Sequence, residues 1–315
     1  MAKGPSSSKR TDPLTCIGYR TVGPIAAGAF STVVRARRVG GRSEPEVAVK
    51  SFPSSKYKKP GWLKNALKNE IDVLLLLQPS GHAHVANLIE LHDEGMRGLF
   101  CTHAVLEYCS GGSVTRHLRS LGHSTGLSEP HGSALVEQLA IALAHLHDLG
   151  IAHRDVKAEN VLYTDSRREQ IKLCDYGFAV ICGSRKLRSV CGSPAYMAPE
   201  INAKLAHYGP PLDCWALGCF AFEVLHGCAP FTAPSLETLH LRIKRVDHAA
   251  FNKKLSSEVK RLIMVLWVVN PDDRCNAAEA VRLWHAARTR HAAPAAAPQP
   301  PADERMPMEG QHDEI

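Results

Sequence analysis

The stretch HRDVKAEN covers residues 153–160, and LCDYG follows at residues 173–177. A helical pattern, ALVEQLAIALAHLHDLG, precedes them at 134–150. Further upstream, STVVRARRV (31–39) and EVAVKSF (46–52) are β-branched runs separated by a turn that contains glycine, which is typical of a strand pair. The pattern therefore predicts a small β-rich lobe followed by a larger helical lobe.

Two further segments support this division. Residues 62–77 repeat their apolar positions at helical spacing, and DCWALGCFAFEVLHG at 213–227 also has a helical pattern. The residues that share the helical spacing in the first segment are Leu63, Leu67, Glu70, Ile71 and Leu74.

Composition limits the class of protein. The chain has 315 residues, of which 44% are hydrophobic and 22% charged, as in globular proteins with a substantial core. The longest apolar run near the end, LIMVLWVV from Leu262, is too short to span a bilayer, and MAKGPSSSKR at the start lacks the apolar stretch of a signal peptide. The ten cysteines include no Cys-x-x-Cys pair, so we expect free thiols and an intracellular location, in the cytoplasm or nucleus.

The net charge of +7 is modest for this length. Its densest clusters are RARRVGGR from Arg35 and KYKK from Lys56. Basic clusters of this kind are either solvated faces or nucleic-acid sites, and the chain carries no nucleic-acid motif. We expect neither a nucleic-acid nor a membrane partner.

Five short motifs follow one another in a fixed order. They are AAGAFSTV (26–33), VAVK (47–50), HRDVKAEN (153–160), DYG (175–177) and APE (198–200). In this order and spacing the chain resembles the eukaryotic protein kinases of the serine/threonine type. CGSPAYMAPE (191–200) and GCAPF (227–231) are most similar to the calcium/calmodulin-kinase or AMP-kinase-like branches.

The resemblance implies an α+β, bilobal protein kinase fold over about residues 18–288. The N-lobe would cover about 18–106, the hinge 107–112 and the C-lobe about 113–288. Residues 1–13 are expected to form a flexible arm, and the Ala/Pro-rich residues 292–315 a disordered tail.

The resemblance also assigns catalytic roles. Lys50 would hold the α/β-phosphates of ATP and pair with Glu70. Asp155 would accept the proton of the substrate hydroxyl, and Lys157 would steady the γ-phosphate. The metal ligands would be Asn160 and Asp175, whose oxygens suit a hard Mg²⁺ ion.

Further positions are expected to form the nucleotide site and its scaffold. The nucleotide-binding set is Ala26, Gly28, Ser31, Val33, Ala48, Lys50, Glu107, Cys109 and Leu162. Leu106 would border the adenine pocket, Asp213 would brace the catalytic loop, and Glu200 would pair with Arg274.

Two positions depart from the family pattern. The phosphate loop keeps only Gly28, because Ala26 and Ser31 stand at the other glycine places; alanine is tolerated where φ stays negative, at a cost of about 1 kcal/mol or less per site. Tyr176 stands where phenylalanine is usual. We expect its ring to pack on His153 and Leu74 and its hydroxyl to find water or a polar neighbour near Glu70, since an unpaired buried hydroxyl costs about 1–3 kcal/mol.

The resemblance assigns a second set of residues to regulation and to substrate choice. Ser189 would be phosphorylated by an upstream kinase and bind Arg154 through charge-assisted hydrogen bonds, although Val180 and Ala66 offer no basic support. Phe178 indicates a serine acceptor. Glu159 and Glu223 match acidic positions that contact substrate arginines, while Ser113 replaces a further glutamate.

Three alternatives stay open at the level of sequence. The chain is expected to be an ATP- and Mg²⁺-dependent serine/threonine kinase acting on proteins, and the main alternative is a pseudokinase that binds nucleotide without turnover. A basic nucleic-acid-binding protein lacks a supporting motif. Cys174, Cys182 and Cys191 are either redox sensors or buried fillers.

Overall fold

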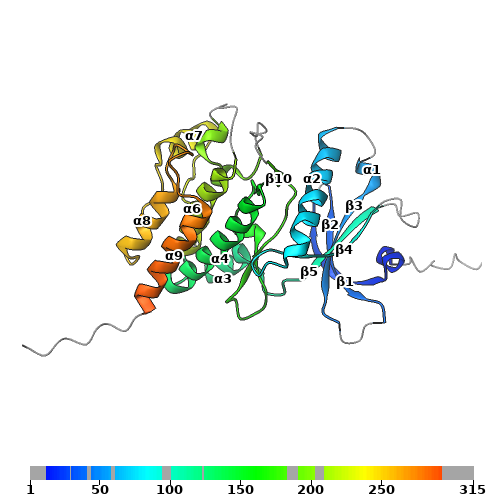
Figure 1. Ribbon diagram of the computed structural model, residues 1–315. Coiled ribbons are helices and arrows are strands. Elements are labelled where there is room, and N and C mark those ends of the chain that lie inside the picture. The colour runs from blue at the N-terminus through cyan, green and yellow to red at the C-terminus, as the bar shows by residue number, and fades with distance from the viewer. Residues whose placement is uncertain are drawn as a thin grey trace, which may run out of the picture.

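The computed structural model shows two lobes joined by a short connection (Figure 1). The structure describes residues 12–28, 30–40, 44–57, 61–93, 101–122, 124–182, 191–202 and 209–292. One lobe consists mainly of a sheet with a helix beside it, and the other consists mainly of helices. This arrangement confirms the α+β, bilobal fold expected from the sequence.

The smaller lobe is built on a five-stranded antiparallel sheet with the order β1-β2-β3-β5-β4. Its strands are β1 (Tyr19–Ala27), β2 (Thr32–Arg38), β3 (Val47–Pro53), β4 (Leu88–His92) and β5 (Cys101–Glu107). Its helices are η1 (Pro13–Ile17), α1 (Ser54–Tyr57), α2 (Trp62–Leu77) and η2 (Gln78–Ser80).

Strand β3 shows how alternation directs residues to the site. Side chains of a strand point to opposite faces in turn. Val47 and Val49 therefore pack into a small core with η1, whereas Lys50 and Phe52 face α2 on the other side of the sheet. The lysine is thus turned toward the space between the lobes.

Helix α2 has the bounds and the face expected from its periodicity. Its apolar side chains contact the main core, and Glu70 lies buried on the same face. The contacting side chains are Leu63, Leu67, Ile71 and Leu74.

The larger lobe is organised around two buried helices, α4 and α6, with α8 and α9 packed against them (Figure 1). Its helices are α3 (Val114–Leu121), α4 (Glu129–Asp148), η3 (Ala158–Asn160), η4 (Pro194–Tyr196), α5 (Pro199–Asn202), α6 (Pro211–His226), α7 (Leu236–Arg245), α8 (Ser257–Leu266) and α9 (Ala277–Ala292). Helix α6 is buried nearly all round and contributes Trp215, Phe220 and Phe222, all with 0% of their surface exposed.

Two short antiparallel sheets carry the loops of the site. One has the order β6-β8-β9 and the other pairs β10 with β7. Their strands are β6 (Gly112–Ser113), β7 (Ile151–Ala152), β8 (Val161–Tyr163), β9 (Ile171–Leu173) and β10 (Val180–Ile181). Residues 153–160 connect β7 to β8, and residues 174–179 connect β9 to β10, so both quoted motifs are loops held at each end by a strand.

The ends of the fold differ slightly from the predicted boundaries. The arm predicted for residues 1–13 overlaps η1 at Pro13, where the Asp12 side chain accepts a hydrogen bond from the amide of Leu14 at 3.0 Å. At the other end α9 continues to Ala292. Residues 1–11 and 293–315 lie outside the described residues, so the predicted arm and tail stay predictions.

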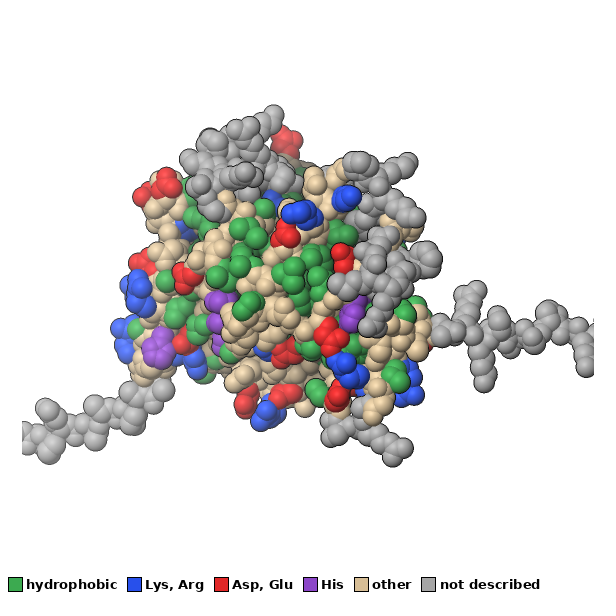
Figure 2. All heavy atoms as spheres, turned by 45° about the vertical axis from the view of Figure 1, so that its right-hand side comes forward, with side chains coloured by type: hydrophobic (Ala, Val, Ile, Leu, Met, Phe, Trp, Pro, Cys, Tyr) green, Lys and Arg blue, Asp and Glu red, His purple; other side chains and the backbone are tan. Residues whose placement is uncertain are grey.

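Surface charge is mixed over the face shown in Figure 2, where Lys and Arg side chains lie among Asp and Glu. Within the RARRVGGR cluster, Arg37 lies 2.9 Å from Glu46, and Arg38 lies 3.1 Å from Glu44 and also pairs with Glu90. These pairs make the cluster a solvated, charge-balanced face. Among the described helices, none is long and apolar enough to cross a membrane.

Candidate active site

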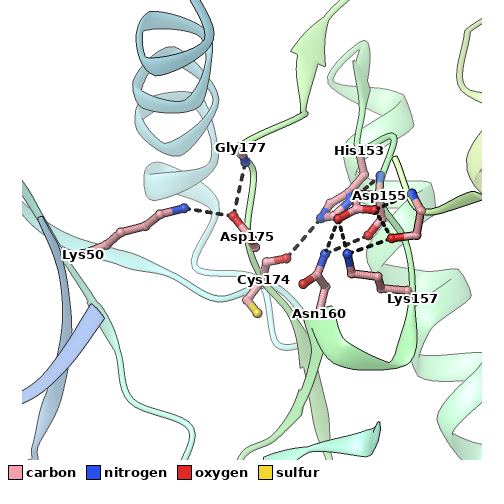
Figure 3. Close-up of polar contacts among 9 residues, drawn as sticks. Lys50, His153, Asp155, Lys157, Asn160, Cys174, Asp175 and Gly177 are labelled. Atoms are coloured by element: carbon pink, nitrogen blue, oxygen red, sulfur yellow. Dashed lines mark hydrogen bonds and ion pairs between the residues drawn. The ribbon is translucent and has the colours of Figure 1, made fainter. Parts of the chain in front are cut away.

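Lys50 connects three elements at the centre of the site. Its Nζ lies 2.5 Å from Glu70 Oε1 on α2. The same Nζ lies 2.9 Å from Asp175 Oδ1 on the loop after β9 (Figure 3). Burial lowers the pKa of Lys50, but the two carboxylates outweigh it, so the net pKa is raised and the amine stays charged. The sequence prediction of a Lys50–Glu70 pair is confirmed.

Asp155 lies in a second group of polar side chains beside this one (Figure 3). Its Oδ2 accepts hydrogen bonds from Lys157 Nζ at 2.6 Å and from Asn160 Nδ2 at 3.1 Å. Asn160 Nδ2 also donates to the Asp155 carbonyl at 2.8 Å. Two bonds from within the loop thus hold the carboxylate at Oδ2, and Ser193 adds a contact to Oδ1 from outside the loop.

Ser193 is a site residue that the sequence analysis missed. Its amide and hydroxyl both donate to Asp155 Oδ1, at 3.1 and 3.0 Å, and its Oγ accepts from Lys157 Nζ at 2.9 Å. Gly192, with φ +101°, brings this segment close: a Cβ there would lie 2.5 Å from the Arg154 carbonyl. The Gly-Ser-Pro sequence at 192–194, with a glycine that permits a close approach, was the signal in the sequence that could have indicated this contact.

Asp213 braces the catalytic loop as predicted. Its carboxylate, fully buried in α6, accepts from the amides of His153 and Arg154 at 2.9 and 2.8 Å. His147 Nε2 lies 3.0 Å from the same carboxylate. Burial raises the pKa of Asp213, but these hydrogen bonds lower it by more than burial raises it. The net pKa is lowered, so the group is held as a carboxylate.

The oxygen donors of the site fit Mg²⁺ carried on a nucleotide. Asn160 uses its Nδ2 on Asp155, an orientation that leaves its amide oxygen for a ligand. Burial raises the pKa of Asp175, but Lys50 more than offsets this, so the net pKa is lowered and the carboxylate stays ionised. The described residues hold no cluster of three or more His, Cys, Asp or Glu side chains suited to a metal. A Mg²⁺ ion that keeps phosphate and water ligands needs only one or two protein oxygens, so the pair is sufficient.

A cavity of about 630 Å³ opens between the lobes beside these groups. It brings together every residue of the predicted nucleotide-binding and metal sets. They are Ala26, Gly28, Ser31, Val33, Ala48, Lys50, Glu107, Cys109, Asn160, Leu162 and Asp175. Glu70, Leu106 and Glu159 line it as well. Asp155 and Lys157 do not line it, but Asp155 is bonded to Asn160, which does.

The connection between the lobes is anchored by a residue that the sequence analysis did not consider. Lys172 on β9 is buried and lies 3.0 Å from Glu107 Oε2, while its Nζ also donates to the Val85 carbonyl at 3.2 Å. Asn87 Nδ2 lies 3.3 Å from the same Glu107 oxygen. Lys172 thereby fixes the segment that would read the adenine edge. A lysine in a β-strand run gave no signal distinct from a surface charge.

The glycine-poor loop carries no backbone strain in the described residues. Ala26 and Ser31 are not among the described residues with positive φ, and Gly28 has negative φ too. A Cβ on Gly28 would meet only the Ser31 carbonyl, at 3.7 Å. Since this conformation is open to alanine and serine, the loss of two glycines does not by itself disable the loop.

Tyr176 packs where expected but bonds elsewhere. Its ring lies edge-on to His153 with centroids 5.5 Å apart. Its hydroxyl donates to the Leu173 carbonyl at 3.0 Å, so the prediction of water or a polar neighbour near Glu70 was wrong. The partner is a backbone carbonyl of β9, a contact that is set only by packing.

The acidic residues predicted to bind substrate lie on neighbouring elements. Glu159 in η3 is exposed, and Glu223 in α6 is largely buried. Burial, together with the Glu159 charge, raises the pKa of Glu223 to about 7, while Arg119 opposes the shift. Glu223 Oε2 is buried and accepts no hydrogen bond from the described residues. Phe178, in the loop between β9 and β10, is 45% exposed.

The remaining predictions concern a structural ion pair, the cysteines and the regulatory residues. Arg274 binds Glu200 with two parallel bonds of 2.7 and 2.9 Å, as expected. Burial raises the pKa of Cys174 and Cys182, which favours buried fillers over reactive thiols. Ser189 lies outside the described residues. Arg154 donates through Nε to the Phe178 carbonyl at 2.6 Å.

The family model described as the protein kinase domain matches residues 19–284. The chain is 33% identical over 265 residues to the probable serine/threonine-protein kinase 2 of Plasmodium falciparum, which covers 82% of this chain and 48% of the relative.

Two further relatives show the same similarity. Human calcium/calmodulin-dependent protein kinase type 1B is 33% identical, with 88% of this chain and 77% of the relative aligned. CBL-interacting protein kinase 11 of Oryza sativa subsp. japonica is 30% identical, with 81% and 49% aligned. The chain thus spans about half the length of several relatives and about three quarters of others.

Proposed function

The chain belongs to the protein kinase domain family, and on that premise we propose that it transfers the γ-phosphate of ATP to a serine or threonine hydroxyl of a protein. The observation that carries the proposal is the double ion pair of Lys50, which contacts Glu70 and Asp175 at the same time. It aligns α2, β3 and the loop after β9 around one cavity, so that a cation and a carboxylate face the phosphates together.

Phosphoryl transfer requires little covalent work from the protein and much positioning of charge. Lys50 neutralises the α/β-phosphates, and Asp175 and Asn160 hold the Mg²⁺ of the nucleotide. Bound Mg²⁺ neutralises charge on the transferring phosphoryl group. Lys157 stands beside Asp155 and steadies the γ-phosphate as charge moves to the leaving oxygen.

Asp155 orients the acceptor hydroxyl and accepts its proton. In the described structure both of its carboxylate oxygens are occupied, one by Ser193 and the other by Lys157 and Asn160. A substrate hydroxyl within hydrogen-bond distance therefore takes the place of the Ser193 hydroxyl at Oδ1, while the Ser193 amide continues to hold the carboxylate.

For the substrate we propose a serine with basic residues on its N-terminal side. Glu223 offers a buried carboxylate oxygen without a partner in the described structure, and Glu159 adds a second negative charge nearby. A guanidinium forms two parallel hydrogen bonds with a carboxylate and would relieve the repulsion between the two glutamates. Ser113 adds no charge, because a serine hydroxyl is neutral, and its Oγ already accepts the amide of Arg116 at the start of α3. The selectivity is therefore moderate.

For regulation we propose phosphorylation of Ser189 by an upstream kinase, with Arg154 as the receiving cation. The Arg154 amide donates to the Asp213 carboxylate, and the Arg154 side chain donates to the Phe178 carbonyl. A phosphate paired with Arg154 would therefore act on the loop after β9. Full activity of Ser189→Ala, compared with wild type shown to be phosphorylated at Ser189, would refute this role.

The location proposed is inside the cell. All ten cysteines are free thiols, as expected for a reducing compartment. The mixed charge around Arg35–Arg38 supports protein rather than nucleic-acid partners.

The test of the activity is Asp155→Asn with Mg-ATP and a generic basic peptide. We expect the turnover to fall about 10²- to 10⁴-fold, the usual contribution of a positioned general base, while the thermal shift produced by Mg-ATP persists. The exposed residue Asp272 provides the matched control, since Asp272→Asn should keep wild-type turnover. Wild-type protein that binds Mg-ATP without transfer would instead indicate the pseudokinase.

A further inference from the structure

Two histidines lie face to face where the smaller lobe meets the larger one. The rings of His82 and His145, here called the histidine pair, are stacked with centroids 4.4 Å apart and planes 3° from parallel. His82 belongs to the interlobe loop, residues 81–87, which joins η2 to β4, whereas His145 lies near the end of α4. Both residues are partly exposed, so their rings can exchange protons with solvent. Neither of them lines the cavity.

The hydrogen bonds of the two rings identify their protonation states. His82 Nδ1 accepts the amide of His84 at 3.2 Å, so this nitrogen must be unprotonated. His145 Nε2 lies 3.0 Å from Ser80 Oγ, whose own proton is donated to the Leu77 carbonyl at 2.7 Å, so Nε2 carries a proton. The structure therefore requires a neutral His82.

The surroundings of His82 disfavour a positive charge on its ring. From its own loop His84 faces it, with ring centroids 6.0 Å apart. From α4 it is faced by His145, and from β9 by Lys172, whose Nζ lies 3.4 Å from the His82 carbonyl. Glu137 of α4 supplies an opposite charge, which acts on His84. Burial, the largest cause, and the three basic neighbours lower the pKa of His82 from the ordinary 6.5 to about 4.

The interlobe loop is bonded to the strand that leads to the metal-binding aspartate. The Ala86 amide donates to the Leu173 carbonyl, and the Leu173 amide donates to the His84 carbonyl, both at 2.9 Å. His84 Nδ1 also lies 3.1 Å from the Ile171 carbonyl. Because Asp175 follows Leu173 by two residues, the position of its carboxylate depends on β9 staying bonded to this loop.

We propose that the histidine pair is an acid-sensitive contact that keeps the interlobe loop attached to α4 and β9. Protonation of His82 removes the acceptor of the His84 amide. It also places a cation against His145 and Lys172, so the loop detaches as the pH falls. The position of Asp175, and with it the affinity for Mg-ATP, then depends on pH; this last consequence rests on the proposed function, whereas the contact itself does not.

The size of the effect follows from linkage between protonation and attachment. A histidine whose pKa is lower in the attached loop than in the detached loop favours attachment only while it is neutral. With a pKa of about 4 when attached and the ordinary 6.5 when detached, the ratio of attached to detached loop falls as the pH falls. Relative to pH 7.5, the ratio is about fourfold lower at pH 6.0 and about thirtyfold lower at pH 5.0.

Hydrogen exchange measures this ratio, because the Ala86 and Leu173 amides are bonded between the loop and β9 and exchange when these bonds open. We expect their protection factors, corrected for the intrinsic pH dependence of exchange, to fall about thirtyfold between pH 7.5 and pH 5.0 in wild type. His82→Asn should limit the fall to less than about threefold, because an asparagine oxygen accepts the amide two residues on and does not titrate. Amides of the buried helix α6 report any global unfolding.

His240→Asn is the matched control, since His240 on α7 is partly exposed like His82 and lies outside this cluster. It should keep the wild-type fall in protection. A wild type whose protection factors do not fall, or a His82→Asn protein with the wild-type pH dependence, would overturn the proposal. If His82→Asn does not fold, titration of the His82 ring in wild type by NMR takes its place, and a pKa at or above 6.5 would overturn the proposal.

Calorimetric titration with Mg-ATP at the same pH values tests the consequence for the site. Wild type should lose more affinity between pH 7.5 and pH 5.0 than His82→Asn does, and this difference separates the histidine pair from the titration of the nucleotide itself. Equal losses in the two proteins would overturn the link from the loop to Asp175. A wild type that binds no Mg-ATP at any pH would overturn the proposed function, and the exchange result would still decide the contact.

Discussion

Glu223 should make the stability of this protein fall as the pH rises, and a single substitution should remove that dependence. Its carboxylate is largely buried in α6, Oε2 has no hydrogen-bond partner among the described residues, and Glu159 lies near enough to repel it. Burial, the largest cause, and this repulsion raise its pKa from the ordinary 4.5 to about 7.

A carboxyl whose pKa is higher in the folded chain than in the unfolded chain destabilises the fold once the pH exceeds its unfolded value. The unfolded chain then releases the proton while the folded chain retains it. The loss of stability begins near pH 4.5 and is complete just above pH 7. At 1.36 kcal/mol per pKa unit, the penalty is about 1 kcal/mol at pH 5.5 and about 3 kcal/mol at pH 8.

The substitution Glu223→Gln removes this titration. Any cost of the buried amide is the same at both pH values, so the change in its effect between pH 5.5 and pH 8 isolates the carboxyl. We expect Glu223→Gln to gain about 2 kcal/mol relative to wild type over that interval, which corresponds to about 4–6 °C in Tm for a domain of this size.

The assay is thermal unfolding of both proteins at the two pH values, with urea denaturation where the unfolding is reversible. Glu169→Gln is the control, because Glu169 is exposed and its substitution should change stability by less than about 0.5 kcal/mol at either pH. A Tm difference between Glu223→Gln and wild type that is the same at pH 5.5 and pH 8 would refute the reasoning. A substrate guanidinium bound to Glu223 would remove the same penalty for ionising this carboxyl, which links the stability measurement to substrate binding.

Asp175→Ala should abolish the Mg²⁺ dependence of ATP binding, because a metal-binding carboxylate is lost, whereas Asn160→Ala should weaken that dependence less. Calorimetric titration at varied Mg²⁺ measures both effects. An unchanged Mg²⁺ dependence in Asp175→Ala would contradict the metal role. Tyr176→Phe should lower stability by about 1 kcal/mol, since it deletes the hydroxyl that donates to Leu173 at 3.0 Å, and a higher Tm than wild type would show that this bond is not stabilising. On peptide arrays Phe178→Val should raise the use of threonine as the acceptor. Glu159→Ala and Glu223→Ala should each weaken the preference for arginine in the substrate. Selection of acidic or proline-directed peptides by wild type would count against the substrate proposal.

The order of elements and the composition of the site were accessible from the sequence. Periodicity placed α2 correctly at residues 62–77, and the β-branched runs located β2 and β3. These signals are local: a helix or strand with one buried face must repeat its apolar residues at the period of that structure. The five ordered motifs then indicated which charged residues meet, and the Lys50–Glu70 and Glu200–Arg274 pairs are present.

Only the tertiary structure decided contacts that depend on where a backbone segment passes. The Tyr176 hydroxyl bonds to the carbonyl of Leu173, and Lys172 reaches the hinge through Glu107. Ser193 reaches Asp155 from 38 residues away. No periodicity encodes such partners, since their distances follow from the packing of β9 and the segment before η4 against the catalytic loop.

The same limit applies to the environment of ionisable groups. The sequence identified Glu223 as an acidic residue at a position that binds substrate in relatives, but its burial in α6 and its proximity to Glu159 arise from the packing of that helix against η3. The sequence therefore determined which chemical groups this protein has and roughly where they lie along the chain. Their protonation and their partners were set by desolvation and distance, which exist only once the lobes are folded.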